Sequence, residues 1–372
     1  MGIEIKPYTD DKKGIVIDFN MRLKAGGASV SFPELNIPKW LPNIDDRKIF
    51  QEYFLALENN SIVRGAYILK HQNFSFSGDI ISIADYQLPI SEGIVNKQYN
   101  IIGIHLLTNA LKKQPILFAL GMGGYEESLP KMLKAMRWEM FSIPFYFKII
   151  HTQQFLRKIT YFKNTIVKRL LLNLIYVTGL GLIAVKLLQF FYKGGKIRNN
   201  SISCDEVNEF SSWANDLWEK CKCKYAMTAV RDKNTLNILY PNDDERFIRL
   251  VIAENNSVIG WAVVLNTQMS NHKQFGNMRV GSIVDCLALP EDASKVIFSA
   301  TNYLEKVGVD IIVSNQSHNY WCSALNKSGF IKGPSNFIFA ASKKLTNYLQ
   351  PWESIKSRMH INRGDGDGPN NL

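Results

Sequence analysis

The sequence is poor in cysteine, and all of its cysteines lie in the second half of the chain. They are Cys204, Cys221, Cys223, Cys286 and Cys322. So few cysteines in 372 residues exclude a small disulfide-stapled scaffold and favour free thiols in a reducing cytoplasm. The short pattern around Lys222 lacks the second pair of ligands that a structural zinc site needs, so no metal is expected.

The sequence also lacks an apolar signal segment at its start, which reads MGIEIKPYTDDKK. The segment Leu170 to Val185 has no charge for sixteen residues, but a membrane-spanning helix usually needs ~20 apolar residues. A spanning helix would have to include Lys186 and continue to Tyr192. We therefore predict a cytoplasmic protein with a buried or interfacial helical linker here, whose basic flanks can touch an acidic membrane surface.

Composition indicates a globular chain of more than one domain. Apolar residues make up 46% of the sequence and charged residues 21%, which is typical of folded proteins. A length of 372 residues predicts two domains. The formal net charge of +11 favours an anionic partner, whether a nucleotide cofactor, an acidic membrane or nucleic acid.

A hairpin pattern occurs twice. Two apolar runs are joined by Glu58-Asn59-Asn60-Ser61 in the first half and by Glu254-Asn255-Asn256-Ser257 in the second. Asparagine tolerates the positive φ angles of tight hairpin turns, so each pattern predicts two strands and a turn. A glycine follows at nearly the same spacing, Gly65 in one copy and Gly260 in the other.

The similarity continues for about a hundred residues beyond the hairpin. The matching pairs, in chain order, are Ile80 to Asp85 with Gly281 to Asp285, Leu88-Pro89 with Leu289-Pro290, Ile116 to Leu120 with Ile311 to Ser314, and Arg137-Trp138 with Gly329-Phe330. We therefore predict two copies of one α/β unit, at residues 1–150 and 204–347. An apolar helical linker, 151–203, would join them, and a flexible tail, 348–372, would follow.

Each copy is predicted to alternate strands and helices. In the first, a strand from Ile80 to Leu88 is followed by a loop, a helix, a strand from Ile116 to Leu120, a shorter helix and a last strand from Phe141 to Phe147. Where a strand leads through a loop into a helix, backbone N–H groups can hold an anion such as a pyrophosphate.

This order of elements resembles the GNAT family of acyl-CoA N-acyltransferases over about residues 3 to 147 and 205 to 345. The resemblance implies an α/β (α+β) fold with two tandem GNAT-like mixed-sheet domains. It also implies transfer of an acyl group from acetyl-CoA or another acyl-CoA to an amine or hydroxyl of a small-molecule or lipid-linked acceptor. Tandem folds of this kind favour a sugar precursor of bacterial surface polysaccharide as the acceptor.

The resemblance places the donor site on the first copy. The family's loop has the pattern Gln/Arg-x-x-Gly-x-Gly/Ala, in which Gln98 takes the first position, Gly103 the last, and Ile101 replaces the middle glycine. The expected cofactor-binding residues are Val95, Lys97, Gln98, Asn100, Ile102 and Gly103. In the second copy Pro290 to Ser294 is shorter, has no glycine and adds two acidic side chains, which would repel a pyrophosphate.

The resemblance also implies a carboxylate base and a tyrosine acid. Asp85 is the best candidate base, because it ends a strand beside the expected cofactor and a buried carboxylate can have a raised pKa. The family's tyrosine on the late helix is replaced by Leu133 in the first copy and Leu325 in the second. Tyr86 or Tyr125 would have to substitute for it.

His318 stands where the family often has an asparagine at the start of the late helix. It would either face the cleft as a base or cap the helix, and the neighbouring asparagine and serine residues are favoured as caps.

Two other functions are compatible with these residues. A Fem-type aminoacyl transferase also pairs two GNAT-like units but takes its donor from aminoacyl-tRNA, which would explain the basic charge and the imperfect loop. A non-catalytic GNAT-like scaffold that binds a partner would explain the missing tyrosine in both copies.

Overall fold

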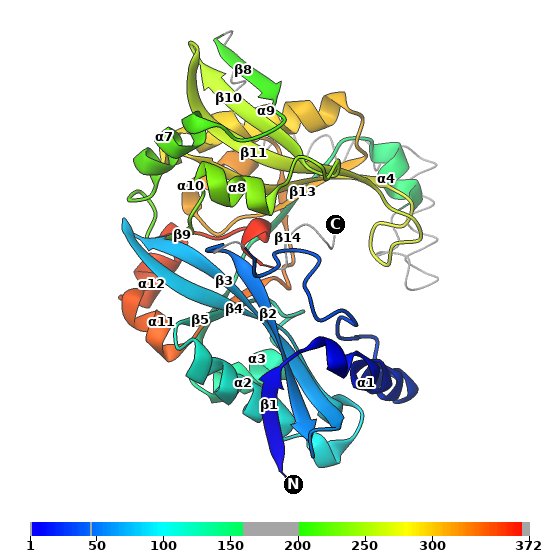
Figure 1. Ribbon diagram of the computed structural model, residues 1–372. Helices are drawn as coiled ribbons and strands as arrows, with labels where there is room; N and C mark the ends of the chain where they lie inside the picture. The colour runs from blue at the N-terminus through cyan, green and yellow to red at the C-terminus, as the bar shows by residue number, and fades with distance from the viewer. Residues whose placement is uncertain (1, 45–46, 159–200, 367–372) are drawn as a thin grey trace. The chain divides into compact units, whose positions relative to one another are not determined.

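The computed structural model describes residues 2–44, 47–158 and 201–366, which form two compact units (Figure 1). Unit 1 comprises Met1–Phe74, Ile80–Phe141 and Ile338–Trp352, and unit 2 comprises Ser75–Asp79, Ser142–Phe337 and Glu353–Leu372. The uncharged stretch from Leu170 to Val185 lies outside the described residues. Within the described ranges, none of the helices combines the length and the apolar character needed to cross a bilayer.

Unit 1 is built on one mixed sheet. Its strands, in spatial order, are β1 (Ile3–Pro7), β2 (Phe50–Glu58), β3 (Ile62–Phe76), β4 (Asp79–Ser91), β5 (Leu117–Gly121), β15 (Ile338–Ala341) and β6 (Glu139–Ser142). The pairs β1–β2, β2–β3 and β5–β15 are antiparallel, whereas β4 and β5 run parallel. A parallel pair needs a crossover, which the helix after β4 provides.

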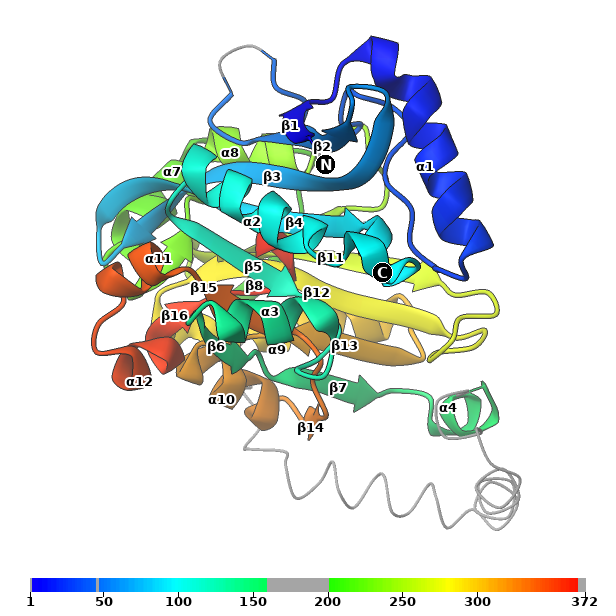
Figure 2. The ribbon, with the colours of Figure 1, turned by 90° about the horizontal axis from the view of Figure 1, so that it is seen from below.

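Helices cover both faces of this sheet (Figure 2). They are α1 (Lys13–Ala25), α2 (Ile102–Lys113), α3 (Ser128–Ala135) and the short α11 (Lys343–Tyr348). The short helix α12 (Trp352–Ile355) begins at the last residue of unit 1 and continues into unit 2. On what we call the α2 face, Leu106 and Leu107 of α2 and Leu133 of α3 are buried in one apolar cluster with the sheet. On the α1 face, Val16 and Phe19 of α1 pack on a second cluster.

Unit 2 has a similar sheet. Its strands, in spatial order, are β14 (Ile331–Gly333), β7 (Phe145–Ile149), β13 (Ile311–Asn315), β12 (Arg279–Ala288), β11 (Ser257–Gln268), β10 (Ile248–Glu254) and β8 (Ile202–Glu206). Here β12 and β13 are the parallel pair. Its helices are α4 (Thr152–Lys158), α7 (Ser212–Cys221), α8 (Lys233–Leu239), α9 (Ala293–Lys306) and α10 (Asn319–Lys327). Two short strands, β9 (Met227–Ala229) and β16 (Met359–His360), pair in parallel with each other.

The two halves of the chain exchange one strand each. The predicted strand from Phe141 to Phe147 is in fact two strands, because Pro144 interrupts it and cannot donate to a sheet ladder. Before Pro144 the chain forms β6 in unit 1, and after it β7 pairs with β13 and β14 in unit 2. In return, β15 from the second half pairs with β5 in unit 1. The units therefore do not follow the predicted boundary at residue 150.

Both predicted hairpins are present. Strands β2 and β3 are joined at Asn59 and Asn60, with φ angles of 51° and 58°, and β10 and β11 are joined at Asn255 and Asn256, with φ angles of 50° and 66°. Two successive residues with positive φ match the right-handed twist of the flanking strands. The repeated sequence pattern thus produces the same turn twice.

The repeated glycine has the same function in both units. A Cβ on Gly65 would lie 2.7 Å from a methyl carbon of Ile102, and a Cβ on Gly260 would lie 2.4 Å from a methyl carbon of Val296. Ile102 begins α2 and Val296 lies in α9, so each glycine lets the crossover helix pack directly on the sheet.

The C-terminal segment, predicted to be flexible, is folded up to Gly366. Helix α12, strand β16 and a capping box at Asn362 and Asp365 follow one another, and both of these residues are buried. The prediction of a flexible tail was wrong for these residues because their polar groups bond within unit 2. Residues 367–372 lie outside the described part.

The strand exchange predicts that neither half of the chain folds alone. A fragment of residues 1–179 lacks β15 and a fragment of residues 180–372 lacks β7, so each would expose unpaired sheet edges that promote aggregation. We expect each fragment to be insoluble when expressed alone and both to co-purify as a folded complex when coexpressed. Cooperative unfolding of soluble, monomeric 1–179 on its own would contradict this result.

Candidate functional site

In unit 1, the parallel strands β4 and β5 separate soon after they meet. Ala84 lies beside Leu117 and Asp85 beside Phe118, and β4 then continues to Ser91 without a further β5 partner. Within this stretch Leu88 has a φ of 45°, which a bulky residue rarely adopts. Main-chain groups of β4 beyond Asp85 therefore have no strand partner on the β5 side, and an extended ligand could pair with them.

The loop after β4 is anchored by a buried carboxylate. Glu92 accepts hydrogen bonds from Arg22 Nε at 3.1 Å and from Arg64 Nη1 at 2.9 Å, and Arg64 also pairs with Glu58 at 2.8 Å. The Arg64 guanidinium lies 4.3 Å from the centre of the Tyr99 ring, a cation–π distance. These contacts tie the loop to α1 and β3, while Ile94 and the residues from Asn96 to Gln98 remain exposed.

The loop leads into α2, whose first backbone N–H groups have no hydrogen-bond acceptor among the described residues. The backbone N–H groups of Ile101, Ile102 and Gly103 have no acceptor among the described residues, and the first turn of α2 contains no acidic side chain. A Cβ on Gly103 would meet only Met132 Sδ, at an ordinary 3.7 Å. Nothing in the described chain thus requires glycine here, and N–H groups arranged in this way at a helix N-terminus could bind an anion.

The predicted cofactor residues lie around this terminus, although their side chains differ in exposure. Lys97, Gln98 and Asn100 are exposed, whereas Ile102 is buried in the α2-face cluster and can contribute only its backbone N–H. Val95 is half-buried, and its side chain packs against the α1-face cluster. The structure therefore gathers these residues, with three polar side chains available to a ligand.

Asp85 is buried at the end of the β4–β5 pairing, and its carboxylate is part of a polar chain. Asp85 Oδ2 accepts from Gln87 Nε2 at 2.8 Å, and Gln87 Oε1 accepts from Gln51 Nε2 at 2.9 Å. Phe118, beside Asp85 in the parallel ladder, lies on the same face. A carboxylate held in this way, at the point where the strands separate, could accept a proton from an acceptor bound there.

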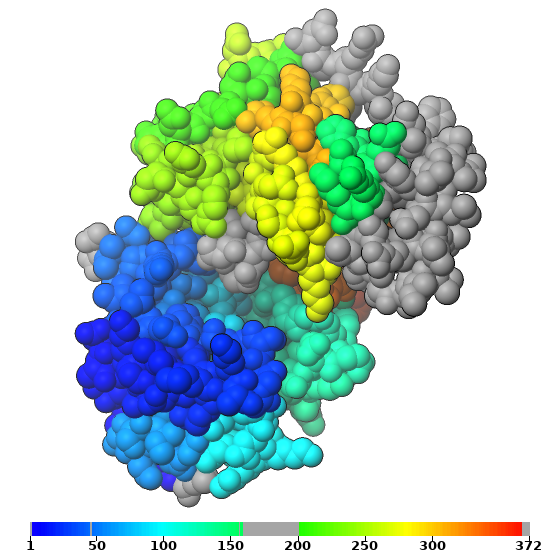
Figure 3. All heavy atoms as spheres, turned by 90° about the vertical axis from the view of Figure 1, so that its right-hand side faces the viewer, coloured from blue at the N-terminus to red at the C-terminus, as the bar shows by residue number. Residues whose placement is uncertain are grey.

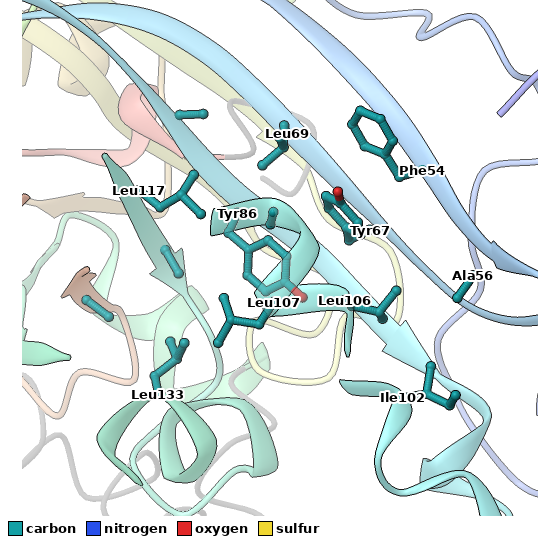
Figure 4. Close-up of a cluster of buried hydrophobic side chains, with 14 of the residues drawn as sticks. Phe54, Ala56, Tyr67, Leu69, Tyr86, Ile102, Leu106, Leu107, Leu117 and Leu133 are labelled. Carbon is teal, nitrogen blue, oxygen red and sulfur yellow. The ribbon is translucent and has the colours of Figure 1, made fainter. Parts of the chain in front are cut away.

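Tyr86 points to the opposite face of the sheet from Asp85. Its ring lies in the α2-face cluster with Tyr67, Leu106 and Leu107 (Figure 4). Burial raises its pKa well above 10, and its hydroxyl has no hydrogen-bond partner among the described residues. In this position Tyr86 is a core residue, separated by the sheet from Asp85.

Tyr125 is exposed, in the turn between β5 and α3. The residues before it, Gly121 to Gly124, all have positive φ, including Met122 at 62°. This turn follows β5 directly at the end where β5 has left β4. Leu133, at the position of the family's tyrosine, is fully buried in the α2-face cluster. Tyr125 is therefore the one candidate acid that can reach solvent in the described structure.

In unit 2 the corresponding separation is filled by the chain itself. Strands β12 and β13 are paired only up to Ile283 and Ser314, and β12 continues to Ala288. The Tyr225 hydroxyl donates to the Ala288 carbonyl at 2.6 Å and accepts from Trp321 Nε1 at 3.0 Å. In the described part of unit 1, no aromatic side chain closes the end of β4 in this way.

A charge network occupies the position of Asp85 in unit 2. Asp285, its counterpart in the repeat, is fully buried and accepts hydrogen bonds from Arg231 Nε at 2.7 Å and the Tyr240 hydroxyl at 2.7 Å. Arg231 also bonds Asp365 at 2.6 Å, and Asn362 Nδ2 donates to Asp285 at 2.8 Å. Asp285 is consequently a structural carboxylate that holds the C-terminal segment in unit 2.

His318 caps α10 with its own side chain, not through a neighbouring asparagine or serine as predicted. Its Nδ1 accepts from the Tyr320 N–H at 3.2 Å. Burial, and to a lesser degree the charge of Arg358, lowers the pKa of His318 to about 4. Burial likewise lowers the pKa of His360, whose ring stacks on Trp321 at 5.2 Å.

Some buried polar residues of unit 1 were not predicted from the sequence as candidate site residues. They are Gln51, Lys70, Gln72 and Gln87, all buried in strands of the sheet. The sequence does contain an indication of them, because these polar residues interrupt apolar strands at positions where the alternation predicts a side chain facing the core. Among the described residues, no group of three histidine, cysteine or acidic side chains is arranged to hold a metal ion.

A mixed sheet whose central parallel strands separate beside a helix N-terminus defines the class of this protein as a GNAT-fold protein, with two such units in tandem. No family model and no curated protein matches the sequence. Solved structures of low sequence identity, however, match over most of the chain and confirm the predicted fold class.

A conserved protein of unknown function from Enterococcus faecalis V583, described as a probable N-acyltransferase, is 8% identical, with 94% of this chain and 74% of that chain covered and a TM-score of 0.51. A GCN5-related N-acetyltransferase from Anabaena variabilis is 10% identical, with 91% and 72% covered and a TM-score of 0.51. A fungal GCN5-related glucosamine N-acetyltransferase region is 9% identical, with 91% and 38% covered and a TM-score of 0.53.

The buried histidines predict a loss of stability in acid. Because the folded-state pKa of His318 is about 4, below the ~6.5 of an unfolded chain, unfolding takes up a proton between these values. Its contribution is complete above pH ~6.5 and is lost as the pH falls towards 4, at up to about 1.4 kcal/mol per pH unit. We expect His318→Asn, which keeps a capping oxygen, to flatten the pH dependence of urea unfolding. An unchanged slope would contradict the assignment.

Proposed function

We propose that this protein transfers an acyl group from acyl-CoA, bound by unit 1, to an amine or hydroxyl of an acceptor. One observation carries the proposal: in unit 1 the separation of β4 and β5 is left open, and α2 begins with N–H groups that have no acceptor among the described residues and with no acidic side chain in its first turn. In unit 2, Tyr225 fills the corresponding separation and Glu291 and Asp292 precede α9. The GNAT fold of the solved structures supports the same reaction class.

The residues of unit 1 fit a pyrophosphate-bearing donor. Backbone N–H groups of Ile101 to Gly103 and the positive end of the α2 dipole would face the phosphates. Exposed Lys97 adds positive charge to the loop. The acyl-bearing arm would lie along the unpaired edge of β4, where main-chain groups from Tyr86 to Ser91 can pair with its amides.

Acyl transfer requires little covalent chemistry from the protein. The acceptor nitrogen or oxygen attacks the thioester carbonyl, a new C–N or C–O bond forms, and the C–S bond breaks. Holding both reactants together supplies much of the rate, and N–H groups of β4 near the thioester would stabilise the developing oxyanion. Asp85 takes the proton from the acceptor, and Tyr125 or a water returns one to the departing thiolate.

The first test concerns the donor. Gly103→Glu places a negative charge at the N-terminus of α2, which stabilises the helix itself but repels a phosphate. We expect an unchanged or higher Tm without ligand, and at least a tenfold loss of acetyl-CoA affinity, about 1.4 kcal/mol. Thermal shift with and without acetyl-CoA measures both effects.

Thr108→Glu is the matched control, because it adds the same charge at an exposed position later in the same helix. It should retain the acetyl-CoA shift. An absence of any acetyl-CoA shift in the natural protein would overturn the proposal, and a shift with tRNA instead would favour an aminoacyl-tRNA donor.

The second test concerns the base. Asp85→Asn keeps an oxygen for the bond from Gln87 but cannot take a proton, so acyl transfer should fall by about 10²- to 10⁴-fold while acetyl-CoA still binds. Thiol release from acetyl-CoA, followed with a panel of amines, measures the rate. Asp79→Asn, at the exposed start of the same strand, should keep full activity. Full activity of Asp85→Asn would contradict the proposed role of Asp85 as the general base.

A further inference from the structure

A row of polar side chains crosses the middle of the α1 face of unit 1. Gln51 and Lys70 are register partners on β2 and β3, so their side chains lie on the same face, and Gln72 follows Lys70 by two residues on that face. Gln87 joins the row through its bond from Gln51, and Asp85 through its bond from Gln87. We call these five residues the polar row.

The polar row interrupts an otherwise apolar surface. At one end of the same face, Ala66 and Ile68 belong to the cluster under α1. At the other end, Phe74 packs edge-on against Phe118, whose ring stacks on Phe339. Buried polar side chains between two apolar regions lower the stability of the fold unless their groups are hydrogen-bonded. Polar residues at these positions therefore suggest a role other than stabilising the sheet.

Two groups at the row are buried without a partner. Neither the amide nitrogen nor the amide oxygen of Gln72, which is 1% exposed, has a hydrogen-bond partner among the described residues. The indole N–H of Trp40 is also buried without a partner, and its ring lies 5.4 Å from Lys70 Nζ. Together they offer two kinds of donor and one acceptor at the polar row. Native proteins rarely leave buried polar groups of this kind without a hydrogen bond.

A chain segment without regular structure lies over this part of the sheet. It is tied down where Asn20 bonds the main chain of Phe32 at 2.9 Å in both directions, and where the Leu41 carbonyl accepts from the Gln51 N–H at 2.8 Å. Trp40 precedes the second tie. The N-terminal residues, drawn in blue in Figure 3, form the surface of unit 1 on this side. Between these ties the segment is held by the bond from the Tyr8 hydroxyl to the Glu34 carbonyl at 2.6 Å, and a ligand at the row would have to displace part of this segment.

We propose that the polar row, with Trp40, is the acceptor-binding subsite and selects an uncharged, polyhydroxylated ring bearing the reactive amine or hydroxyl. The inference rests on the proposed acyl transfer. Hydroxyl groups both donate and accept, so adjacent hydroxyls can satisfy the amide of Gln72 at both of its atoms and accept from the Trp40 indole. An acceptor bound along the row would then present its amine or hydroxyl to Asp85, which belongs to the same row.

Other acceptor classes fit the row less well. An alkyl amine would leave the Gln72 amide and the Trp40 N–H unsatisfied, and a site built for hydrogen bonds discriminates strongly against ligands that lack the partner groups. A polycationic acceptor would need several carboxylates, whereas Asp85 is the one acidic member of the row, beside Lys70.

The test separates binding from folding. Gln72→Leu keeps the shape of the side chain and removes the unpartnered amide, so a ligand-binding role predicts an equal or higher Tm together with weaker acceptor use. Thr301→Val, which removes an unpartnered buried hydroxyl from α9 of unit 2, is the matched control and should leave acceptor use unchanged. Trp40→Phe keeps a ring and removes only the indole donor.

The probes are D-glucosamine, a polyhydroxylated amine, and hexylamine, an amine without hydroxyls. With acetyl-CoA, and with kcat/KM calculated per concentration of unprotonated amine at the pH of the assay, D-glucosamine should have a value at least about tenfold above that of hexylamine. Gln72→Leu and Trp40→Phe should each raise the KM for D-glucosamine about tenfold and leave hexylamine unaffected. Equal use of both amines would overturn the inference, as would a Gln72→Leu protein with lowered Tm and unchanged KM.

A failure of acyl transfer itself is distinguished by a binding measurement without CoA. D-Glucosamine at about 50 mM, enough to fill a site with millimolar Kd, should raise the Tm of the natural protein but not that of Gln72→Leu. A rise in Tm with D-glucosamine, without any acyl transfer, would refute the proposed reaction but support the proposed acceptor subsite. No shift in the natural protein would overturn the subsite.

Discussion

The exchange of β7 and β15 is the constraint on which the rest of the structure depends. Each sheet is completed by a strand from the other half of the sequence, and the two connecting segments are bonded where they pass, with the Ile143 N–H donating to the Phe337 carbonyl at 2.8 Å. In unit 1 the incoming β15 supports β5 on the edge away from β4, so β5 can leave β4 and still remain in a sheet. The separation that forms the candidate donor site is thus stabilised by residues from the end of the chain.

The two units show how one fold can carry different chemistry. Asp85 and Asp285 occupy matching positions, but Asp285 is held by Arg231 and Tyr240 and serves to fix the C-terminal segment. The helix after β4 begins with free N–H groups and no acidic side chain, whereas Glu291 and Asp292 precede α9. Tyr225 then fills the separation in unit 2. Sheet and helices are retained, and the features that would bind an anionic donor are confined to unit 1.

Local signals in the sequence predicted the local structure well. Asn59 and Asn60 form the predicted turn because asparagine tolerates positive φ, and Gly65 is where a helix must approach a strand. The strand exchange and the folded C-terminal segment could not be predicted in this way, because they depend on pairing between residues far apart in the sequence, more than two hundred positions in the case of β5 and β15. For the candidate site, the sequence indicated the loop and Asp85, while the unpartnered amide of Gln72 is apparent only once its neighbours are known.

The central claim is that the acyl donor binds unit 1 at the end of β4 and the start of α2. Hydrogen exchange of the full chain, measured by mass spectrometry with and without acetyl-CoA, tests it most directly, because the first N–H groups of α2 have no acceptor among the described residues and β4 beyond Asp85 has no strand partner on the β5 side. We predict slower exchange over Tyr86–Ser91 and Ile101–Gly103 on adding acetyl-CoA, and no change over α9. Protection of β12 and α9 instead, or of neither helix start, would contradict the account.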